Sequence, residues 1–231
     1  MRERNSDTMI NIAIDGPSGA GKSTVARALA QKLQYVYVDT GAMYRAIGLY
    51  IRRMGISPAD TDAVCACLAQ ITVTLDYAED GTQIVLLNGE DVSRAIRENE
   101  ISAYASAVSK IPAVRAHLLA LQRDMAKRHN VIMDGRDIGT VILPDAQLKI
   151  FLFASPGARA RRRTAELQEK GQSVDYETIL AEINARDEQD RTRDVAPAVP
   201  ADDAVMMDNS DMTIDENIAA IRALMAQRGL L

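Results

Sequence analysis

Glycines, a lysine and a serine near the beginning of the sequence have the spacing of a loop that binds phosphate. Residues 16–23, GPSGAGKS, match the pattern GxxxxGK[ST]. The glycines let backbone N–H groups converge on phosphate oxygens, Lys22 adds a positive charge beside the β- and γ-phosphates, and Ser23 can ligate Mg²⁺. The pattern therefore predicts a site for a nucleoside triphosphate with magnesium.

Other signature residues limit the reaction that the triphosphate can undergo. The sequence has no Asn-Lys-x-Asp element, which a GTPase switch needs to read guanine. A motor or transport ATPase usually has a catalytic Glu after the Asp that ends its strand, whereas here Gly135 follows Asp134 in VIMDGRD. Transfer of the γ-phosphoryl group to a small molecule remains, and it requires a second anion site.

Arginines that follow predicted strands are candidates for that second site. Arg45 lies in DTGAMYR and Arg136 lies in DGRD, each just after a strand. Ligands of open α/β sheets bind at the carboxyl ends of strands, and the guanidinium fork matches a phosphate monoester. Taken alone, either arginine is better explained as an ordinary surface residue, but their occurrence after strand ends beside a phosphate loop favours acceptor binding.

A charged segment near residue 190 offers further acceptor ligands. Arg186, Asp190 and Arg193 are spaced i, i+4 and i+7, so they share one face of a predicted helix. This face is either a solvated row of ion pairs, or a site in which Arg193 holds a phosphate and Asp190 accepts from a sugar hydroxyl. Positive charge that could meet the triphosphate also gathers upstream, at Arg159, Arg161, Arg162 and Arg163.

The predicted elements place the phosphate loop between a strand and a helix. Residues 9–14 form an apolar run typical of a buried parallel strand, and residues 22–34 form a helix. This setting disfavours the alternative of a Gly-rich turn with an exposed lysine. Further strands are predicted over 35–38, 131–133, 148–153 and 204–207, and further helices over 42–54, 57–70, 98–109, 112–129, 157–170, 176–193 and 215–227.

Two turn signals interrupt this alternation of strands and helices. Asp80-Gly81 separates strands predicted over 71–77 and 83–87, and Asn88-Gly89 leads into a short third strand. This antiparallel patch is interpreted as an insertion beside the main sheet. The two long charged helices over 157–170 and 176–193 have the character of a mobile lid.

Composition excludes several classes of partner. The 231 residues are 47% hydrophobic, enough for a sizeable core, and 27 basic against 32 acidic residues leave a net charge of −5. This balance argues against a nucleic-acid binder or a binder of acidic membranes. Because no run of about 18 apolar residues occurs, we expect a soluble cytoplasmic protein.

The chain resembles bacterial cytidylate kinases, the (d)CMP kinases of the P-loop nucleoside monophosphate kinase group, over almost its whole length after Met9. The shared segments are IAIDGPSGAGKST, DTGAMYR, DGRDIGTVILPDA, KIFLFAS, LQEKG and RDEQDRTRDVAPAVPADDA. The resemblance implies a three-layer α/β/α fold with a five-stranded parallel core over about 9–40, 130–155 and 195–231. It also implies a monophosphate-binding region with an inserted antiparallel sheet over about 41–129, and a helical lid over about 156–194.

Site residues are carried over from the resemblance position by position. It implies that the acceptor phosphate is held by Thr40, Arg45, Arg136 and Arg193, that the sugar contacts Arg186 and Asp190, and that Ser106, Arg115 and Asp137 read the base. Asp134 joins this CMP-binding set. The residues expected to bind ATP are Gly16, Pro17, Ser18, Gly19, Ala20, Gly21, Lys22, Ser23, Thr24 and Arg162. Those expected to act in catalysis are Lys22, Arg136, Arg193 and Asp137.

Cytosine complements the base-reading residues chemically. Asp137 can accept from its exocyclic amine, and Arg115 can donate to N3 and O2. In uracil a carbonyl oxygen would face the Asp137 carboxylate, so that two acceptors oppose each other. A buried mispair of this kind costs on the order of a few kcal/mol. The residues and the resemblance together predict Mg·ATP-dependent phosphorylation of CMP and dCMP, and the resemblance implies a monomer. Two alternatives stay open: a kinase for another acceptor such as UMP or shikimate, and a regulatory module that only binds ATP.

Overall fold

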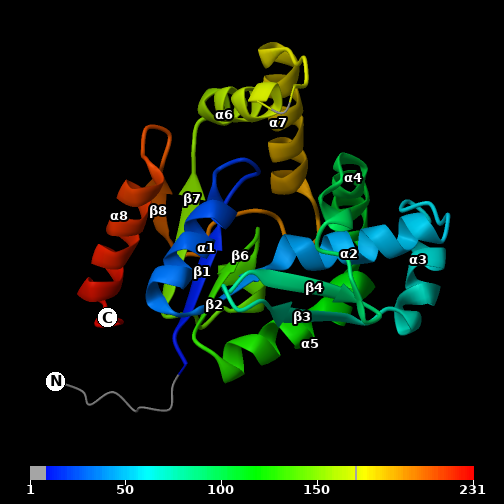
Figure 1. Ribbon diagram of the computed structural model, residues 1–231, viewed down its shortest axis with the longest axis horizontal. Coiled ribbons are helices and arrows are strands. Elements are labelled where there is room, and N and C mark those ends of the chain that lie inside the picture. Colours follow the sequence, from blue (N-terminus) through cyan, green and yellow to red (C-terminus); the bar gives the residue numbers. More distant parts are fainter. Residues whose placement is uncertain (1–8, 170) are drawn as a thin grey trace. The chain divides into compact units, whose positions relative to one another are not determined.

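The computed structural model, which describes residues 9–169 and 171–231, is a mixed α/β fold. A five-stranded parallel sheet has the strand order β2-β6-β1-β7-β8, and a separate three-stranded sheet has the order β3-β4-β5 (Figure 1). The strands are β1 Asn11–Asp15, β2 Val36–Asp39, β3 Val73–Tyr77, β4 Gln83–Leu87, β5 Glu90–Asp91, β6 Val131–Asp134, β7 Leu148–Phe153 and β8 Val205–Asp208. These sheets confirm the predicted α/β class with its parallel core and antiparallel insertion.

The described residues form eight α-helices. They are α1 Lys22–Leu33, α2 Thr40–Arg53, α3 Thr61–Cys67, α4 Asn99–Val108, α5 Pro112–Arg128, α6 Pro156–Glu169, α7 Tyr176–Thr192 and α8 Ile214–Gln227. A five-residue π-helix follows β6 at Ile138–Ile142. The sequence did not indicate this π-helix, because its apolar residues also fit a loop or a strand.

Backbone contacts divide the chain into two compact units. The first contains the described residues up to Ile12 together with Ala30–Met133, and the second contains Ala13–Leu29 and Asp134–Leu231. The division into core, monophosphate-binding region and lid is a different, functional one, and it stays a prediction.

In the first unit the inserted sheet packs beside α2. Strands β3 and β4 lie side by side (Figure 1) and pair antiparallel. Val73 lies opposite Leu87, and alternate residues of β4 are buried. The predicted turn contains Gly81 at a φ of 78°, a left-handed conformation that glycine adopts without strain. Helices α2 and α4 also pack against each other, and Gly48 makes this possible: a Cβ there would lie 3.0 Å from the backbone nitrogen of Ala105.

One predicted helix begins later than expected. The helix predicted over 57–70 would begin at Ser57 and Pro58, residue types common at an N-cap and in a first turn, but the structure has a turn there. The Asp60 N–H closes this turn by donating to the Ser57 carbonyl. Helix α3 starts at Thr61 because the Asp60 carboxylate caps it by accepting from the Ala63 N–H at 3.0 Å. The aspartate cap three residues later begins the helix instead, although aspartate and serine are about equally good N-caps in general.

In the second unit, α6 and α7 pack as a pair around their own small core. Ala160, Leu167 and Ile179 are buried between them. The predicted end of the first of these helices, Lys170, lies outside the described residues. The second helix ends one residue earlier than predicted, at Thr192, and Arg193 continues in an extended conformation at φ −66° and ψ 141°.

Among residues 9–169 and 171–231, no helix combines the length and apolar character needed to cross a membrane.

Candidate active site

The phosphate loop begins with a glycine that no other residue could replace. Gly16 has a φ of 143°, and a Cβ on it would lie 1.9 Å from the Leu152 carbonyl oxygen of β7. Strand β1 can therefore run straight into the loop only if this position lacks a side chain. The loop ends at α1, whose first residue is Lys22, so the predicted strand-loop-helix context is present.

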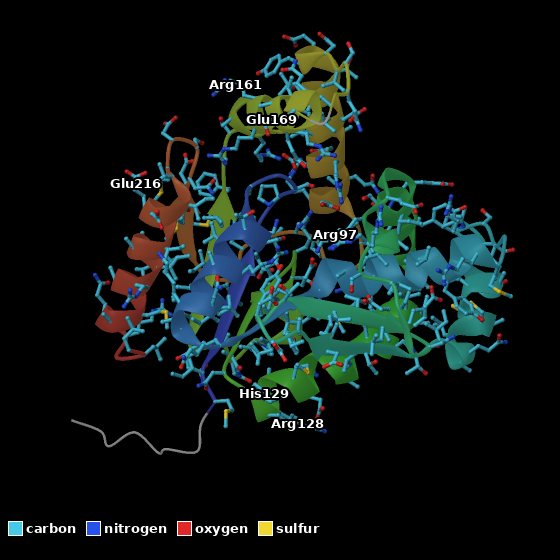
Figure 2. The ribbon with its side chains drawn as sticks, viewed as in Figure 1. Arg97, Arg128, His129, Arg161, Glu169 and Glu216 are labelled. Atoms are coloured by element: carbon cyan, nitrogen blue, oxygen red, sulfur yellow. The ribbon has the colours of Figure 1, made fainter. Side chains whose placement is uncertain are left out.

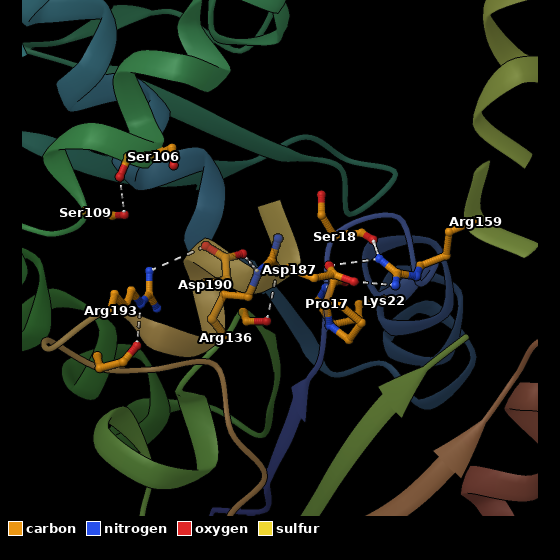
Figure 3. Close-up of polar contacts among 12 residues, drawn as sticks. Pro17, Ser18, Lys22, Ser106, Ser109, Arg136, Arg159, Asp187, Asp190 and Arg193 are labelled. Atoms are coloured by element: carbon orange, nitrogen blue, oxygen red, sulfur yellow. Dashed lines mark hydrogen bonds and ion pairs between the residues drawn. The ribbon is translucent and has the colours of Figure 1, made fainter. Parts of the chain in front are cut away.

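Lys22 is folded into the loop. Its ammonium group donates to the Pro17 carbonyl at 2.7 Å, and the residue is only 5% exposed (Figure 3). Burial, helped by the positive charge of Arg136, holds the pKa of Lys22 well below its ordinary value. An anionic phosphate beside this amine would reverse that shift, because it favours the charged form.

Ser23, the second residue of α1, and Asp134, the last residue of β6, place a hydroxyl and a carboxylate in contact with each other. The Ser23 hydroxyl donates to Asp134 Oδ2 at 2.8 Å, and Asp134 is 4% exposed. In the described part of the chain, no group of three His, Cys, Asp or Glu side chains could hold a metal by itself. A hydroxyl and a carboxylate fit Mg²⁺, which takes few protein oxygens and fills its remaining positions with water and phosphate. The predicted CMP contact of Asp134 stays a prediction.

Asp15, at the end of β1, is a buried carboxylate that the sequence reading missed. It accepts from the backbone N–H groups of Ile138 at 2.7 Å and Gly139 at 2.8 Å. Burial raises the pKa of Asp15 to about 6, against the opposing effect of these two N–H groups. This clamp fixes the π-helix that directly follows Asp137, which is itself 4% exposed. The acidic residue just before Gly16 was the available signal.

Arg159 of α6 holds the phosphate loop by a main-chain contact. The guanidinium donates to the Ser18 carbonyl at 2.9 Å and to the Ala154 carbonyl at 2.9 Å, and it forms a two-pronged ion pair with Asp187 of α7 (Figure 3). Arg159 is 2% exposed. It is thus committed to shaping the loop, and Asp187 is a second residue that the sequence reading missed.

The other arginines at the beginning of α6 differ in their contacts. Arg162 donates to the carbonyls of Asn209 at 2.6 Å and Ser210 at 3.0 Å. The side-chain amide of Asn209 in turn donates to the Ala20 carbonyl of the phosphate loop at 2.8 Å. Arg163 pairs with Glu166 on the helix surface, and Arg161 extends from exposed helix surface (Figure 2). Arg162 is therefore linked to the phosphate loop through one intervening residue, Asn209.

Three predicted acceptor ligands meet within the second unit. Asp190 of α7 accepts from Arg136 Nε at 3.0 Å and lies 3.9 Å from the nearest nitrogen of Arg193 (Figure 3). Arg193 also donates to the Ala196 carbonyl at 2.6 Å. The prediction that Arg193 shares a helix face with Asp190 is wrong, because α7 ends at Thr192 and Arg193 approaches Asp190 from the extended chain that follows. Arg186 does lie on the helix, where it is exposed.

In the first unit, Thr40 and Arg45 belong to the first two turns of α2. Thr40 is buried at the first helical position. Arg45 donates to Asp39 Oδ2 at 2.8 Å, and Asp39 is also the N-cap of the helix. The predicted phosphate ligands of this unit are thereby held at one helix end, where unpaired backbone N–H groups favour anions.

The predicted base readers of the first unit converge on Ser109. The Ser109 hydroxyl donates to the Ser106 carbonyl at 2.9 Å, and Arg115 donates to the Ser109 carbonyl at 3.3 Å. The guanidinium of Arg115 also lies over the ring of Tyr44, 5.7 Å from its centre. Tyr44 of α2 was not predicted, although it lies in the DTGAMYR segment, and it orients Arg115 by a cation–π contact.

Comparison with known proteins gives consistent matches over nearly the whole chain. The family model described as cytidylate kinase matches residues 12–227. A protein named cytidylate kinase from Caldicellulosiruptor saccharolyticus is 50% identical over 215 residues, covering 93% of this chain and 95% of its own. Its namesake from Mycobacterium avium is 50% identical over 218 residues, covering 94% and 95%. A solved structure of an uncharacterized protein from Eubacterium ventriosum shares the fold, with a TM-score of 0.52, 13% identity and coverage of 94% and 99%.

Proposed function

Because the chain belongs to the cytidylate kinase family, we propose that it transfers the γ-phosphoryl group of ATP to CMP and dCMP, giving ADP with CDP or dCDP. Phosphorylation of a nucleoside monophosphate is the activity of this family, and the chain spans nearly the full length of its relatives.

The observation that carries the mechanism is the cluster of Arg136, Asp190 and Arg193. Two guanidinium groups share one carboxylate, and the side chains are only 21%, 11% and 9% exposed, respectively. The cluster therefore holds one excess positive charge in a poorly solvated place. An incoming monophosphate dianion would be attracted there, because Coulombic interactions are stronger away from bulk water.

The donor is held by the phosphate loop. Its backbone N–H groups and Lys22 bind the phosphates of ATP, and Arg162 approaches from α6. Ser23 and Asp134 would hold Mg²⁺, which would supply charge neutralisation for the transferred group. No protein nucleophile is required, because an acceptor phosphate oxygen is already an anion at neutral pH and attacks the γ-phosphorus in line. The chain contributes positioning and a fixed positive field.

Selection of cytosine rests on Asp137 and Arg115. We propose that the Asp137 carboxylate accepts from the exocyclic amine, and that Arg115, oriented by Tyr44 and the Ser109 carbonyl, donates to N3 and O2. Ser106 completes the set. Thr40 and Arg45 bind the acceptor phosphate together with the arginines above, and Arg186 and Asp190 contact the sugar.

A coupled assay of ADP release tests the activity against its rivals. CMP, dCMP, UMP, AMP and shikimate are offered in turn with Mg·ATP. The proposal expects release with CMP and dCMP, and a rate with UMP lower by about 100-fold, the factor that a mispair of a few kcal/mol implies. Faster turnover of another acceptor would assign a different kinase, and acceptor-independent ATP binding without ADP release would indicate a regulatory module.

Removing the loop lysine tests the mechanism. Lys22→Ala should lower kcat by at least about 100-fold, because an electrostatic group aimed at the transferred charge is typically worth 10²–10³. Lys32→Ala, in the same helix but exposed, serves as the matched control and should retain normal turnover. Near-normal kcat for Lys22→Ala, with circular dichroism unchanged in both variants, would contradict the scheme. The monomeric state and cytoplasmic location stay predictions.

A further inference from the structure

The first turn of α2 is organised by one carboxylate that acts in two directions. Asp39 Oδ1 accepts from the Ala42 N–H at 2.8 Å and so caps the helix, while Oδ2 accepts from Arg45 at 2.8 Å. The side chain of Asp39 is 16% exposed and that of Arg45 is 27% exposed. The rotamer of Asp39 therefore fixes both the helix end and the guanidinium.

The backbone of Asp39 is held by a residue of the inserted sheet. Gln83, the first residue of β4, accepts from the Asp39 N–H with its side-chain carbonyl at 2.9 Å, although the two residues lie 44 positions apart. Gln83 is 8% exposed, so water does not readily replace it as an acceptor. Strand β4 thereby reaches the residue on which Arg45 depends.

The space around Arg45 is shaped for this arrangement. A Cβ on Gly41 would lie 3.1 Å from Arg45 Nη1 and 3.2 Å from Asp39 Oδ1, closer than side chains normally approach. The absence of a side chain at Gly41 lets the guanidinium fold back over the first turn. Arg45 Nε is buried and has no hydrogen-bond partner in the described chain. This N–H is therefore available to an acceptor from outside the chain, either a water or a ligand.

We propose that Gln83 is a positioning residue for the acceptor phosphate, because it fixes Asp39, which in turn presents the unpaired Nε of Arg45. The inference rests on the proposed function, in which Arg45 binds the phosphate of CMP. The inserted sheet then has a role in the reaction: it completes the acceptor site through a hydrogen bond rather than through contact with substrate.

Gln83→Met tests the inference, because methionine keeps the length of the side chain and removes the strong acceptor. Loss of one buried hydrogen bond that orients Arg45 should raise KM for CMP about fivefold. KM for ATP and the midpoint of thermal unfolding should change little. Gln70→Met is the matched control: Gln70 accepts from Tyr50 near the other end of α2, at an exposed site, and its loss should leave both KM values unchanged.

A double-mutant cycle separates positioning from general damage. In the Arg45→Ala background, Gln83→Met should add no further rise in KM for CMP, since its effect passes through Arg45. The inference would be overturned if Gln83→Met raised KM for CMP equally in the Arg45→Ala and wild-type backgrounds, or did not raise it in the wild-type background.

An NMR readout keeps this result independent of the proposed function. The Arg45 Nε–H resonance of the ligand-free protein should move in Gln83→Met and stay in place in Gln70→Met; an unmoved resonance overturns the inference whether or not CMP is a substrate. Failure of the wild-type chain to phosphorylate CMP would instead refute the proposed function alone.

Discussion

The ion pair between Arg159 and Asp187 allows a quantitative test of how the phosphate loop is supported. In Asp187→Ala, the guanidinium of Arg159, only 2% exposed, loses its counter-ion. Removing one partner of a buried pair costs about 3–5 kcal/mol, since a charge stays buried without compensation. The low end applies here, because Asp187 is 27% exposed and two carbonyls still accept from Arg159. We expect about 3 kcal/mol.

For a chain of 231 residues, 1 kcal/mol corresponds to about 2–4 °C in Tm, so Asp187→Ala should lower Tm by about 6–12 °C. Differential scanning calorimetry without nucleotide measures this shift. The matched control is Glu188→Ala, which removes the neighbouring carboxylate of an exposed pair with Arg191 and should change Tm by no more than about 2 °C.

A double replacement tests the same ion pair in a second way. Replacing both partners by apolar residues, Arg159→Met with Asp187→Leu, should recover much of the lost Tm, because the burial penalty disappears together with the attraction. KM for ATP should nevertheless be higher in the double variant than in the wild type, since the Ser18 carbonyl has lost its donor. If Asp187→Ala lowered Tm by less than about 2 °C, the claim that this variant leaves the Arg159 charge buried and uncompensated would be refuted.

Two further predictions concern Asp15 and Gly48. The pKa of Asp15 is about 6 in the folded chain and 3.8 in the unfolded one, so folding stability should fall by up to about 3 kcal/mol as pH rises from about 4 to 6. Urea unfolding between pH 4 and 7 should show a flatter pH dependence for Asp15→Asn, and identical slopes would exclude Asp15 as the cause. Gly48→Ala should destabilise the protein by about 1–2 kcal/mol, because the new Cβ forces α2 and α4 apart and this outweighs the better helix propensity of alanine. A raised Tm for this variant would show that the helices yield without cost.

The sequence was most informative where a function depends on a short continuous segment. The phosphate loop requires particular residues within eight positions, and the sheet elements follow from local apolar runs, so both could be predicted. Arg136 was found because it directly follows a strand end. The pairing of Arg136 with Asp190 could only be anticipated in outline, because it joins residues 54 positions apart.

Residues that act through other residues could not be predicted. Gln83 is an ordinary strand residue in the sequence, and only the fold brings its carbonyl to the Asp39 N–H. Arg159 was grouped with its neighbours as a candidate triphosphate ligand, yet its burial and its main-chain partners set it apart from Arg161 and Arg163. The start of α3 was predicted too early because Ser57 and Asp60, three residues apart, are both suitable N-caps. The sequence alone does not decide between two such neighbouring caps.

The contact between Arg159 and the Ser18 carbonyl also constrains how the predicted lid can move. This guanidinium joins the beginning of α6, the second half of α7 and the phosphate loop. A rigid swing of both helices would therefore break its hydrogen bonds to the Ser18 and Ala154 carbonyls, while its ion pair with Asp187 would move with the helices. Bending at points beyond Arg159 and before Asp187 breaks none of them. The least costly motion is therefore a flexing of the distal helical hairpin about a stationary base, so the mechanical boundary of the lid lies inside its helices rather than at residues 156 and 194.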